Sequence, residues 1–109
     1  MIQYSDFEKI EIRVGTILTA QEFPLAKKPA YRLAIDFGEL GIKNSSAQIT
    51  HHYTIDELPG KQIIAVVNFP PKQIANFFSE CLVLGVVNKD NSVVLLQPDK
   101  LVKNGDRIA

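Results

Sequence analysis

Few side chains of this 109-residue sequence have the type and spacing that catalysis or metal binding requires. His51 and His52 are the only histidines, and neighbours on an extended segment point to opposite faces, so they do not easily share one metal ion. Cys81 is the single cysteine, and it opens an apolar run, where a free cysteine is usually a small buried hydrophobe rather than a nucleophile. Phosphate-binding and dinucleotide-binding glycine motifs are absent from the sequence. We therefore expect a protein that is not an enzyme and that has no catalytic residues, metal site or cofactor.

The most unusual segment spans residues 68–80, NFPPKQIANFFSE. It contains three phenylalanines and two prolines but only two charged residues, and its prolines and asparagines argue against a central β-strand. Two interpretations remain open. The rings either close one end of the fold as core, or some of them form an exposed apolar surface, which marks an interface.

The charge balance limits the classes of ligand. The chain has 12 Lys and Arg against 12 Asp and Glu, so its formal net charge is zero. Nucleic-acid-binding domains usually have an excess of basic residues, because phosphate neutralisation drives binding. A basic patch would therefore have to arise by segregation of charges on the folded surface.

Other features of the composition indicate a cytoplasmic globular protein with one domain, residues 1–109. Hydrophobic residues make up 46% of the chain, which is too many for disorder and enough for one modest core. The single cysteine cannot form an intramolecular disulfide. The N-terminus lacks the basic start and apolar run of a signal peptide, and no apolar stretch approaches the ~20 residues that span a bilayer.

Period-two alternation of apolar and polar residues predicts most elements as strands. The even positions from Ile10 to Ala20 predict a half-buried strand of about eleven residues, in which Gly15 marks a bend or bulge. Capping-box patterns at Ser5–Glu8 and Thr54–Glu57 predict two short helices. Further strands are predicted at 31–37, 45–50, 63–67 and 81–87, with 92–96 returning as the hairpin partner of the last.

The order of these elements indicates the architecture. Three strands, a short helix and then two or more strands, with a long and bent first strand, fit an all-β, five-stranded Greek-key barrel of the OB type. Short helices and an extra C-terminal hairpin would be attached to it. An SH3-like barrel is the main alternative.

Motifs spread over nearly the whole chain resemble the tRNA-binding domain superfamily. The matching segments are 12–17 (IRVGTI), 35–38 (IDFG), 45–50 (SSAQIT), 68–74 (NFPPKQI), 79–80 (SE), 82–85 (LVLG), 94–99 (VLLQPD) and 104–105 (NG). Each motif alone is weak, but together and in register they are specific. Within the superfamily, the chain is most similar to the CsaA family of export-related chaperones.

This resemblance implies an OB-fold homodimer that binds unfolded or pre-export polypeptide and associates with the secretion ATPase SecA. The wider superfamily includes tRNA-binding modules, which usually carry a His-Pro-x-Ala-Asp-Lys-Leu segment after the first strand. Here residues 23–30 read FPLAKKPA, without the His and the Asp-Lys-Leu, which favours the CsaA branch. Phe78 stands where CsaA-type chains commonly have Lys, which removes a charge and enlarges the apolar surface.

Two binding functions follow from these observations. For a chaperone that binds extended polypeptide, the residues expected at the site are the apolar Phe69, Ile74, Phe77 and Phe78 with the hydrogen-bonding Asn68, Gln48 and Lys72. For a tRNA-binding module, in which cations hold phosphates and aromatic rings stack on bases, they are Arg13, Lys43, Lys72 and Ser79. The altered loop at 23–30 and the neutral net charge favour polypeptide, whereas cations clustered on the surface would favour RNA.

Overall fold

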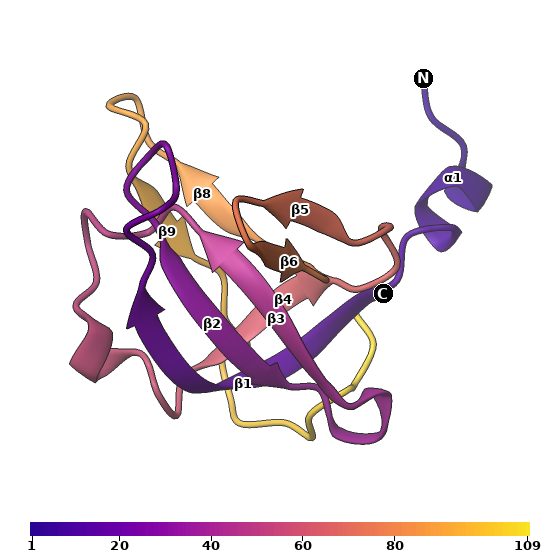
Figure 1. The fold of residues 1–109 in the computed structure, drawn as a ribbon. Helices are drawn as coiled ribbons and strands as arrows, with labels where there is room; N and C mark the ends of the chain where they lie inside the picture. Colours follow the sequence, from indigo (N-terminus) through magenta and orange to yellow (C-terminus); the bar gives the residue numbers. More distant parts are fainter.

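Nine strands and three short helical segments make up the chain in a computed structural model that describes residues Met1–Ala109 (Figure 1). In chain order they are α1 (Tyr4–Glu8), β1 (Ile12–Glu22), β2 (Tyr31–Asp36), η1 (Gly38–Leu40), β3 (Ile42–Ala47), η2 (Ile55–Glu57), β4 (Gln62–Val66), β5 (Lys72–Ile74), β6 (Phe77–Ser79), β7 (Leu82–Val83), β8 (Gly85–Val87) and β9 (Val93–Leu95). They form a five-stranded antiparallel sheet in the order β3-β2-β1-β4-β7 and two hairpins, β5-β6 and β8-β9. None of the helical segments has the length and apolar character needed to cross a membrane.

The five-stranded sheet curls into a nearly closed barrel. The long β1 pairs with β4 along its first half and with β2 along its second half. At the seam beside β3, the backbone N–H of Glu80 donates to the carbonyl of Asn44 at 2.7 Å, and the Asn44 N–H donates to the Glu80 carboxylate at 2.9 Å. The all-β, five-stranded OB-type barrel expected from the sequence is therefore confirmed, with short helices and the β8-β9 hairpin attached to it.

Aliphatic and aromatic side chains from alternating strand positions fill the barrel. In β2, Tyr31, Leu33 and Ile35 are buried and the residues that alternate with them are half-buried, as the period-two pattern predicts. Phe37 lies in the same core. Gly15 of β1 packs directly against it, because a Cβ atom at this position would lie 2.7 Å from both the Phe37 ring and Cγ2 of Ile35. Only glycine allows this close approach without displacing core side chains.

A β-bulge at Leu18 shifts the inward face of β1. The register with β2 skips one residue between Ile17 and Thr19. As a result Ile17 is 1% exposed and Leu18 is 42% exposed, although simple alternation groups Leu18 with the buried Ala20. The irregularity expected in this strand exists, but it lies beyond Gly15.

Two further predictions needed correction. The capping box of α1 is formed by Gln3 and Asp6, whose carboxylate accepts the Gln3 N–H at 2.9 Å, rather than by the predicted Ser5–Glu8 pattern. The second box, Thr54–Glu57, opens a 3-10 turn as expected. The prediction of one strand over 81–87 was wrong, because β7 pairs with β4 while β8 leaves the sheet to pair with β9.

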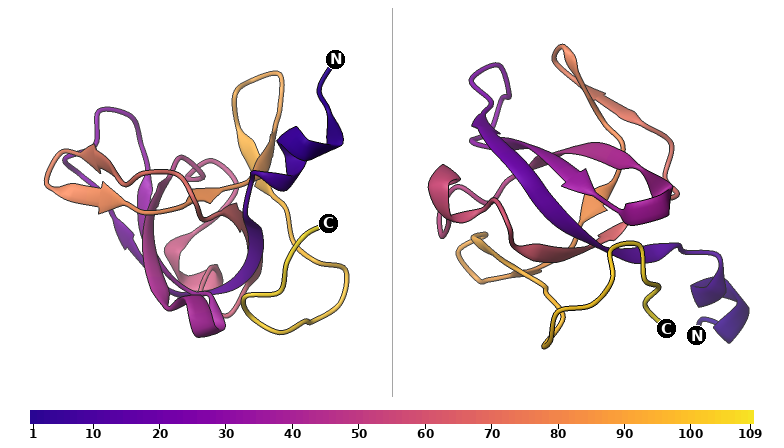
Figure 2. Two further views of the ribbon diagram at one scale, coloured as in Figure 1. Left: turned by 90° about the vertical axis from the view of Figure 1, so that its right-hand side faces the viewer. Right: turned by 90° about the horizontal axis from the view of Figure 1, so that it is seen from below.

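The β5-β6 hairpin is the element that the sequence pattern did not predict. We call it the arm. It projects from the barrel beside the loop that connects β1 and β2 (Figure 2), and the two segments line a common cleft. Each of its strands is only three residues long, and two prolines precede them. Ala75 in its turn has a φ of +53°, a left-handed conformation that glycine and asparagine adopt more readily.

The two chain ends lie away from the arm. α1 stands apart from the barrel and buries no residue (Figure 1). The C-terminal segment runs back along β1, where the Val14 N–H donates to the carbonyl of Asp106 at 3.0 Å and the Ile108 N–H to that of Ile12 at 2.9 Å. The C-terminal segment therefore pairs with the edge of the first half of β1 that does not bond to β4.

Candidate functional site

Pairing within the arm determines which of its side chains face the barrel. Lys72 is opposite Ser79, and Ile74 is opposite Phe77. Paired residues share a face of a hairpin and neighbours alternate, so these four side chains lie on one face and Phe78 lies on the other. Phe77 is half-buried, whereas Phe78 is 56% exposed. The two adjacent phenylalanines therefore do not form one continuous wall.

The barrel-facing side of the arm rests on the loop between β1 and β2. The ring of Phe77 meets that of Phe23 edge-on, with 5.4 Å between ring centroids. Phe23 is only 4% exposed, and the Arg32 guanidinium covers it at 5.6 Å from the ring centroid. Aromatic and cation–π contacts of this geometry are stabilising. Phe77 thus holds the arm in place, which leaves less of its ring for a ligand than the sequence interpretation expected.

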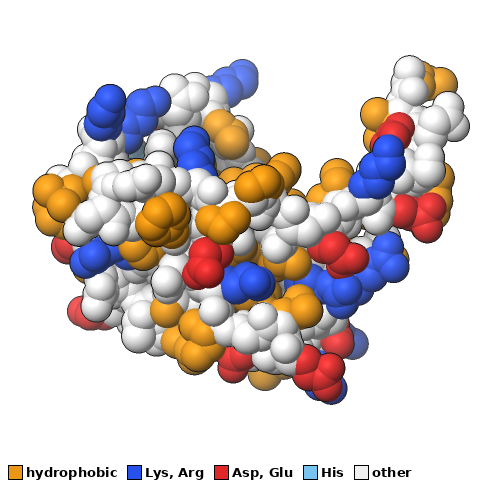
Figure 3. All heavy atoms as spheres, turned by 45° about the vertical axis from the view of Figure 1, so that its right-hand side comes forward, with side chains coloured by type: hydrophobic (Ala, Val, Ile, Leu, Met, Phe, Trp, Pro, Cys, Tyr) orange, Lys and Arg blue, Asp and Glu red, His pale blue; other side chains and the backbone are white.

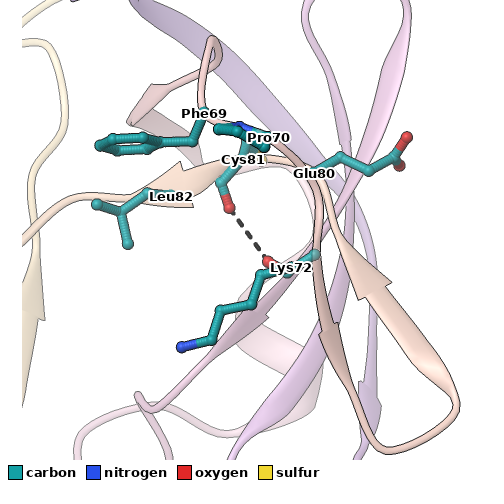
Figure 4. A pocket seen from close by; sticks show the side chains of 7 residues that line it. Phe69, Pro70, Lys72, Glu80, Cys81 and Leu82 are labelled. Atoms are coloured by element: carbon teal, nitrogen blue, oxygen red, sulfur yellow. Dashed lines mark hydrogen bonds between the residues drawn. The ribbon is translucent and has the colours of Figure 1, made fainter.

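An apolar pocket of about 380 Å³ lies at the base of the arm (Figure 4). Its apolar wall comprises Phe69, Pro70 and Leu82, and Phe69 and Leu82 are 54% and 50% exposed. The side chain of Lys72 borders the same opening, while that of Glu80 points away from it (Figure 4). The pocket therefore combines an apolar wall with one cation.

Cys81 also lines this pocket, but its thiol lies 3.8 Å from the Asn44 carbonyl of β3, belongs to the barrel core and is poorly suited to chemistry. Burial raises the pKa of Cys81 to about 11, a rise that a hydrogen bond from Ser45 and the charge of Lys43 only partly offset. At neutral pH the group is a thiol, and the thiolate is the nucleophilic form. Cys81 behaves here as a buried hydrophobe, as its apolar sequence context suggested.

A second hollow, of about 550 Å³, separates the arm from the β1–β2 loop, and we call it the basic cleft. Lys27 and Lys28 of the loop and Lys72 of the arm line it, with Gln48 at the end of β3 and Ile74 of the arm; no acidic residue contributes to the lining. Lysine and arginine side chains gather at the upper left of Figure 3, with acidic side chains lower on that face. Although the net charge is zero, cations are locally concentrated.

His51 lines a further hollow together with Lys28. Residues 50–52 form a turn, so the rings of His51 and His52 lie only 4.9 Å apart, and the expectation that they point to opposite faces was wrong. Nε2 of His52 lies 2.9 Å from Oγ of Ser92, whose hydroxyl donates to Asp90. These bonds from Ser92 lower the pKa of the Asp90 carboxyl. No group of three or more His, Cys, Asp or Glu side chains is placed to hold a metal ion.

Other predicted site residues have structural partners. Asn68 accepts the Glu11 N–H at 2.9 Å and donates to the Lys9 carbonyl at 2.8 Å, so its amide fastens the chain before β1. Arg13 donates to the Glu11 carboxylate at 2.7 Å and to a backbone carbonyl of the C-terminal segment at 3.0 Å.

Two members of the expected RNA-binding set, Lys72 and Ser79, belong to the arm itself, and a third, Lys43, lies in β3. Ser79 accepts the Ser46 N–H at 3.3 Å and donates to the Cys81 carbonyl at 3.2 Å, which secures the base of the arm to β3. Lys43 is half-buried in β3. The structure therefore brings Lys72 and Ser79 together and leaves Arg13 with the C-terminal segment.

Sequence reasoning missed several residues of the two hollows, and three of them matter most, Leu82, Lys27 and Lys28. Leu82 reads as an ordinary strand residue, although it is half-exposed beside Phe69. Lys27 and Lys28 had a recognisable signal, namely a pair of cations in a loop flanked by prolines.

Comparisons with known proteins agree with this fold. The family described as "Putative tRNA binding domain" matches residues 12–107. A solved structure of the chaperone CsaA from Bacillus anthracis is 54% identical, with a TM-score of 0.96 and coverage of 100% of this chain and 99% of that one. The CsaA chaperone from Picrophilus torridus is 61% identical, with a TM-score of 0.94 and complete coverage of both chains.

Similarity extends to part of a much longer enzyme. The methionine–tRNA ligase of Bacteroides fragilis is 36% identical over 107 residues, which is 98% of this chain and 16% of the ligase. The chain therefore spans about one sixth of the ligase, and the comparison concerns one domain of that protein.

Proposed function

Because this chain belongs to the tRNA-binding domain family and, within it, to the CsaA group, we propose that it is a non-catalytic protein that binds unfolded or pre-export polypeptide and assists secretion. Full-length likeness to two chaperones supports this proposal. The proposed compartment is the cytoplasm, where precursors await export, and the secretion ATPase SecA is the partner that the CsaA resemblance implies.

The apolar pocket at the base of the arm carries the proposal. Phe69 and Leu82 expose half of their side chains on either side of an opening large enough for an apolar side chain. Unfolded polypeptide exposes apolar side chains along an extended backbone, whereas folded protein buries most of them. Burial of apolar surface on both partners then drives binding. Phe78 adds an exposed ring on the outer face of the arm.

Binding of a labelled, unfolded precursor, followed by fluorescence anisotropy, tests this function. Truncating Phe69 or Leu82 removes about half of a large apolar side chain from the interface, which lowers the binding free energy by about 1 kcal/mol. Phe69→Ala and Leu82→Ala should therefore each weaken binding about 5-fold. Leu40→Ala is the matched control, because Leu40 is also a half-exposed leucine but lies in η1. Equal affinity of all three folded variants and the parent would refute the site, and absence of precursor binding by the parent would refute the function.

The proposal includes a homodimer. The β8-β9 hairpin exposes four large aliphatic side chains, Val86, Val87, Val94 and Leu96. Val86 pairs with Val94, and Leu96 lies two residues beyond Val94, so these three side chains share one face of the hairpin, while Val87 lies on the other. An exposed apolar face of this kind suits an isologous contact between two copies. Sedimentation equilibrium should give twice the 12.2 kDa mass of the chain. A single species at the monomer mass throughout the micromolar range would exclude the dimer.

A specific observation also favours a second function, the binding of tRNA. The basic cleft lies between the β1–β2 loop, the end of β3 and the arm, which is inserted between β4 and β7. OB folds bind oligonucleotides on this face and with these loops. Affinity for labelled tRNA should then fall steeply with salt and decrease in Lys27→Gln and Lys28→Gln, because each phosphate contact releases counterions. Lack of tRNA binding at low salt would exclude this function.

A further inference from the structure

Lys72 borders both hollows of the binding face. It lines the apolar pocket together with Phe69 and Leu82, and it lines the basic cleft together with Lys27 and Lys28. The two hollows therefore adjoin along one side chain. An extended chain that places an apolar group in the pocket would continue past Lys72 towards the loop lysines.

The cations of the cleft are free to interact with a ligand. The two ion pairs of the chain join Lys9 to Asp6 and Arg13 to Glu11, so Lys27, Lys28 and Lys72 have no carboxylate within 4.0 Å. All three are exposed. Their positive charge is not compensated locally, because the cleft lining includes no Asp or Glu.

The remaining lining chemistry favours a peptide over stacked bases. Amides of Gln48 and Gln73 offer hydrogen bonds to a backbone, and Leu25 and Ile74 offer aliphatic surface. Base recognition in single strands relies on exposed aromatic faces. No aromatic residue lines the basic cleft: the ring of Phe77 is packed edge-on against Phe23, and the exposed ring of Phe78 lies on the other face of the arm. Carboxylate side chains on an extended peptide complement lysine ammonium groups without requiring stacking.

Building on the polypeptide-binding function proposed above, we propose that this protein selects segments in which acidic residues follow or flank an apolar residue. The apolar side chain occupies the Phe69–Leu82 pocket. The carboxylates lie against Lys72 and then Lys27 and Lys28. Charge in the cleft thus adds selectivity to the apolar contact, and segments with basic flanks are disfavoured by repulsion.

The size of the preference follows from the number of exposed pairs. Each exposed ion pair changes affinity only a few-fold, and three of them together predict about 10-fold tighter binding of an acidic-flanked segment than of a neutral one. Screening should remove most of this preference, because the Debye length falls from about 10 Å at 0.1 M salt to about 3 Å at 1 M.

The experiment uses three labelled, unstructured peptides with the same central leucine and with Glu, Gln or Lys at the flanking positions. Anisotropy titrations are made at about 0.1 M and at about 1 M salt. At the lower salt, the peptide with Glu flanks should bind most tightly, the peptide with Gln flanks less tightly and the peptide with Lys flanks most weakly. At the higher salt, the three affinities should be nearly equal. The variant Lys27→Gln/Lys28→Gln/Lys72→Gln should bind all three alike. The control Lys61→Gln/Lys100→Gln/Lys103→Gln removes equal charge outside both hollows and should keep the ranking.

Failure of this inference differs from failure of the proposed function. Equal binding of the three peptides, still weakened by Phe69→Ala, would overturn charge selection and leave polypeptide binding intact. A ranking that survives in the cleft variant would also overturn it. No binding of any peptide, including the neutral one, would overturn both. Salt-sensitive binding of tRNA through the same lysines, without peptide binding, would identify RNA as the ligand and likewise overturn both.

Discussion

The adjacent residues Phe77 and Phe78 should differ sharply in what their truncation does to stability. Phe77 is half-buried, so its apolar contribution is about half of the ~1.5–3 kcal/mol of a fully buried large side chain, and the edge-on contact with Phe23 adds ~0.5–1.5 kcal/mol. Phe77→Ala should therefore lower the free energy of unfolding by about 2 kcal/mol. Phe78→Ala, at an exposed position of the same short strand, should change it by less than about 0.5 kcal/mol.

Urea unfolding monitored by far-ultraviolet circular dichroism measures both values, since the chain has no tryptophan. The two variants lose the same ring from the same strand, so strand propensity cancels between them. A double-mutant cycle with Phe23→Leu should give a coupling energy of about 1 kcal/mol for Phe77 and near zero for Phe78. Equal destabilisation by both truncations, or no coupling between Phe23 and Phe77, would refute the assignment of Phe77 as the anchor of the arm.

Three further predictions concern the barrel and its polar network. Gly15→Ala should destabilise the fold by about 1–3 kcal/mol in thermal unfolding, because its Cβ would lie 2.7 Å from the Phe37 ring; an unchanged melting temperature would contradict this packing. The Cys81 thiol, with its pKa raised from 9.0 to about 11 and its side chain buried, should react with a thiol reagent at least about 10-fold more slowly than an unperturbed cysteine, and native labelling at the free rate would contradict its burial. The pKa of Asp90 is lowered by Ser92, so that its ionised form stabilises the fold above its unfolded pKa and this stability is lost as pH falls through the folded value. Ser92→Ala should accordingly destabilise more at pH ~7 than at pH ~2 in urea titrations, and an equal loss at both would exclude the linkage.

The alternation of apolar and polar residues in the sequence predicted the barrel, because successive side chains of a strand point alternately into the core and out of it. Leu33 and Ile35 face the core in a strand with partners on both sides, so their positions follow directly from period two. The bulge at Leu18 could not be predicted in this way. It is set by how β1 shares its length between two partner strands, which depends on residues far away in the chain.

The arm illustrates what local sequence reasoning cannot reach. Its three-residue strands are too short for a periodic signal, and Ala75 occupies a turn position where glycine or asparagine would have been recognised. Its position depends on the contact of Phe77 with Phe23, which lies on the other side of the cleft. The sequence suggested that some phenylalanines of residues 68–80 are exposed, and Phe69 and Phe78 are. Hydrophobicity alone could not show that Phe77 is half-buried instead.

The anchoring of the arm links the two hollows. At its base, the bonds of Ser79 to β3 and to the Cys81 carbonyl fix the strand opposite Lys72, so the apolar pocket does not depend on the tip. Near its tip, the edge-on contact of Phe77 with Phe23 joins the arm to the loop that carries Lys27 and Lys28. Loss of the Phe77 ring should therefore widen the basic cleft and leave the pocket largely intact. A decrease in peptide binding after Phe77→Ala is consequently no sign of direct contact with the ligand, whereas the same decrease after Phe78→Ala would be.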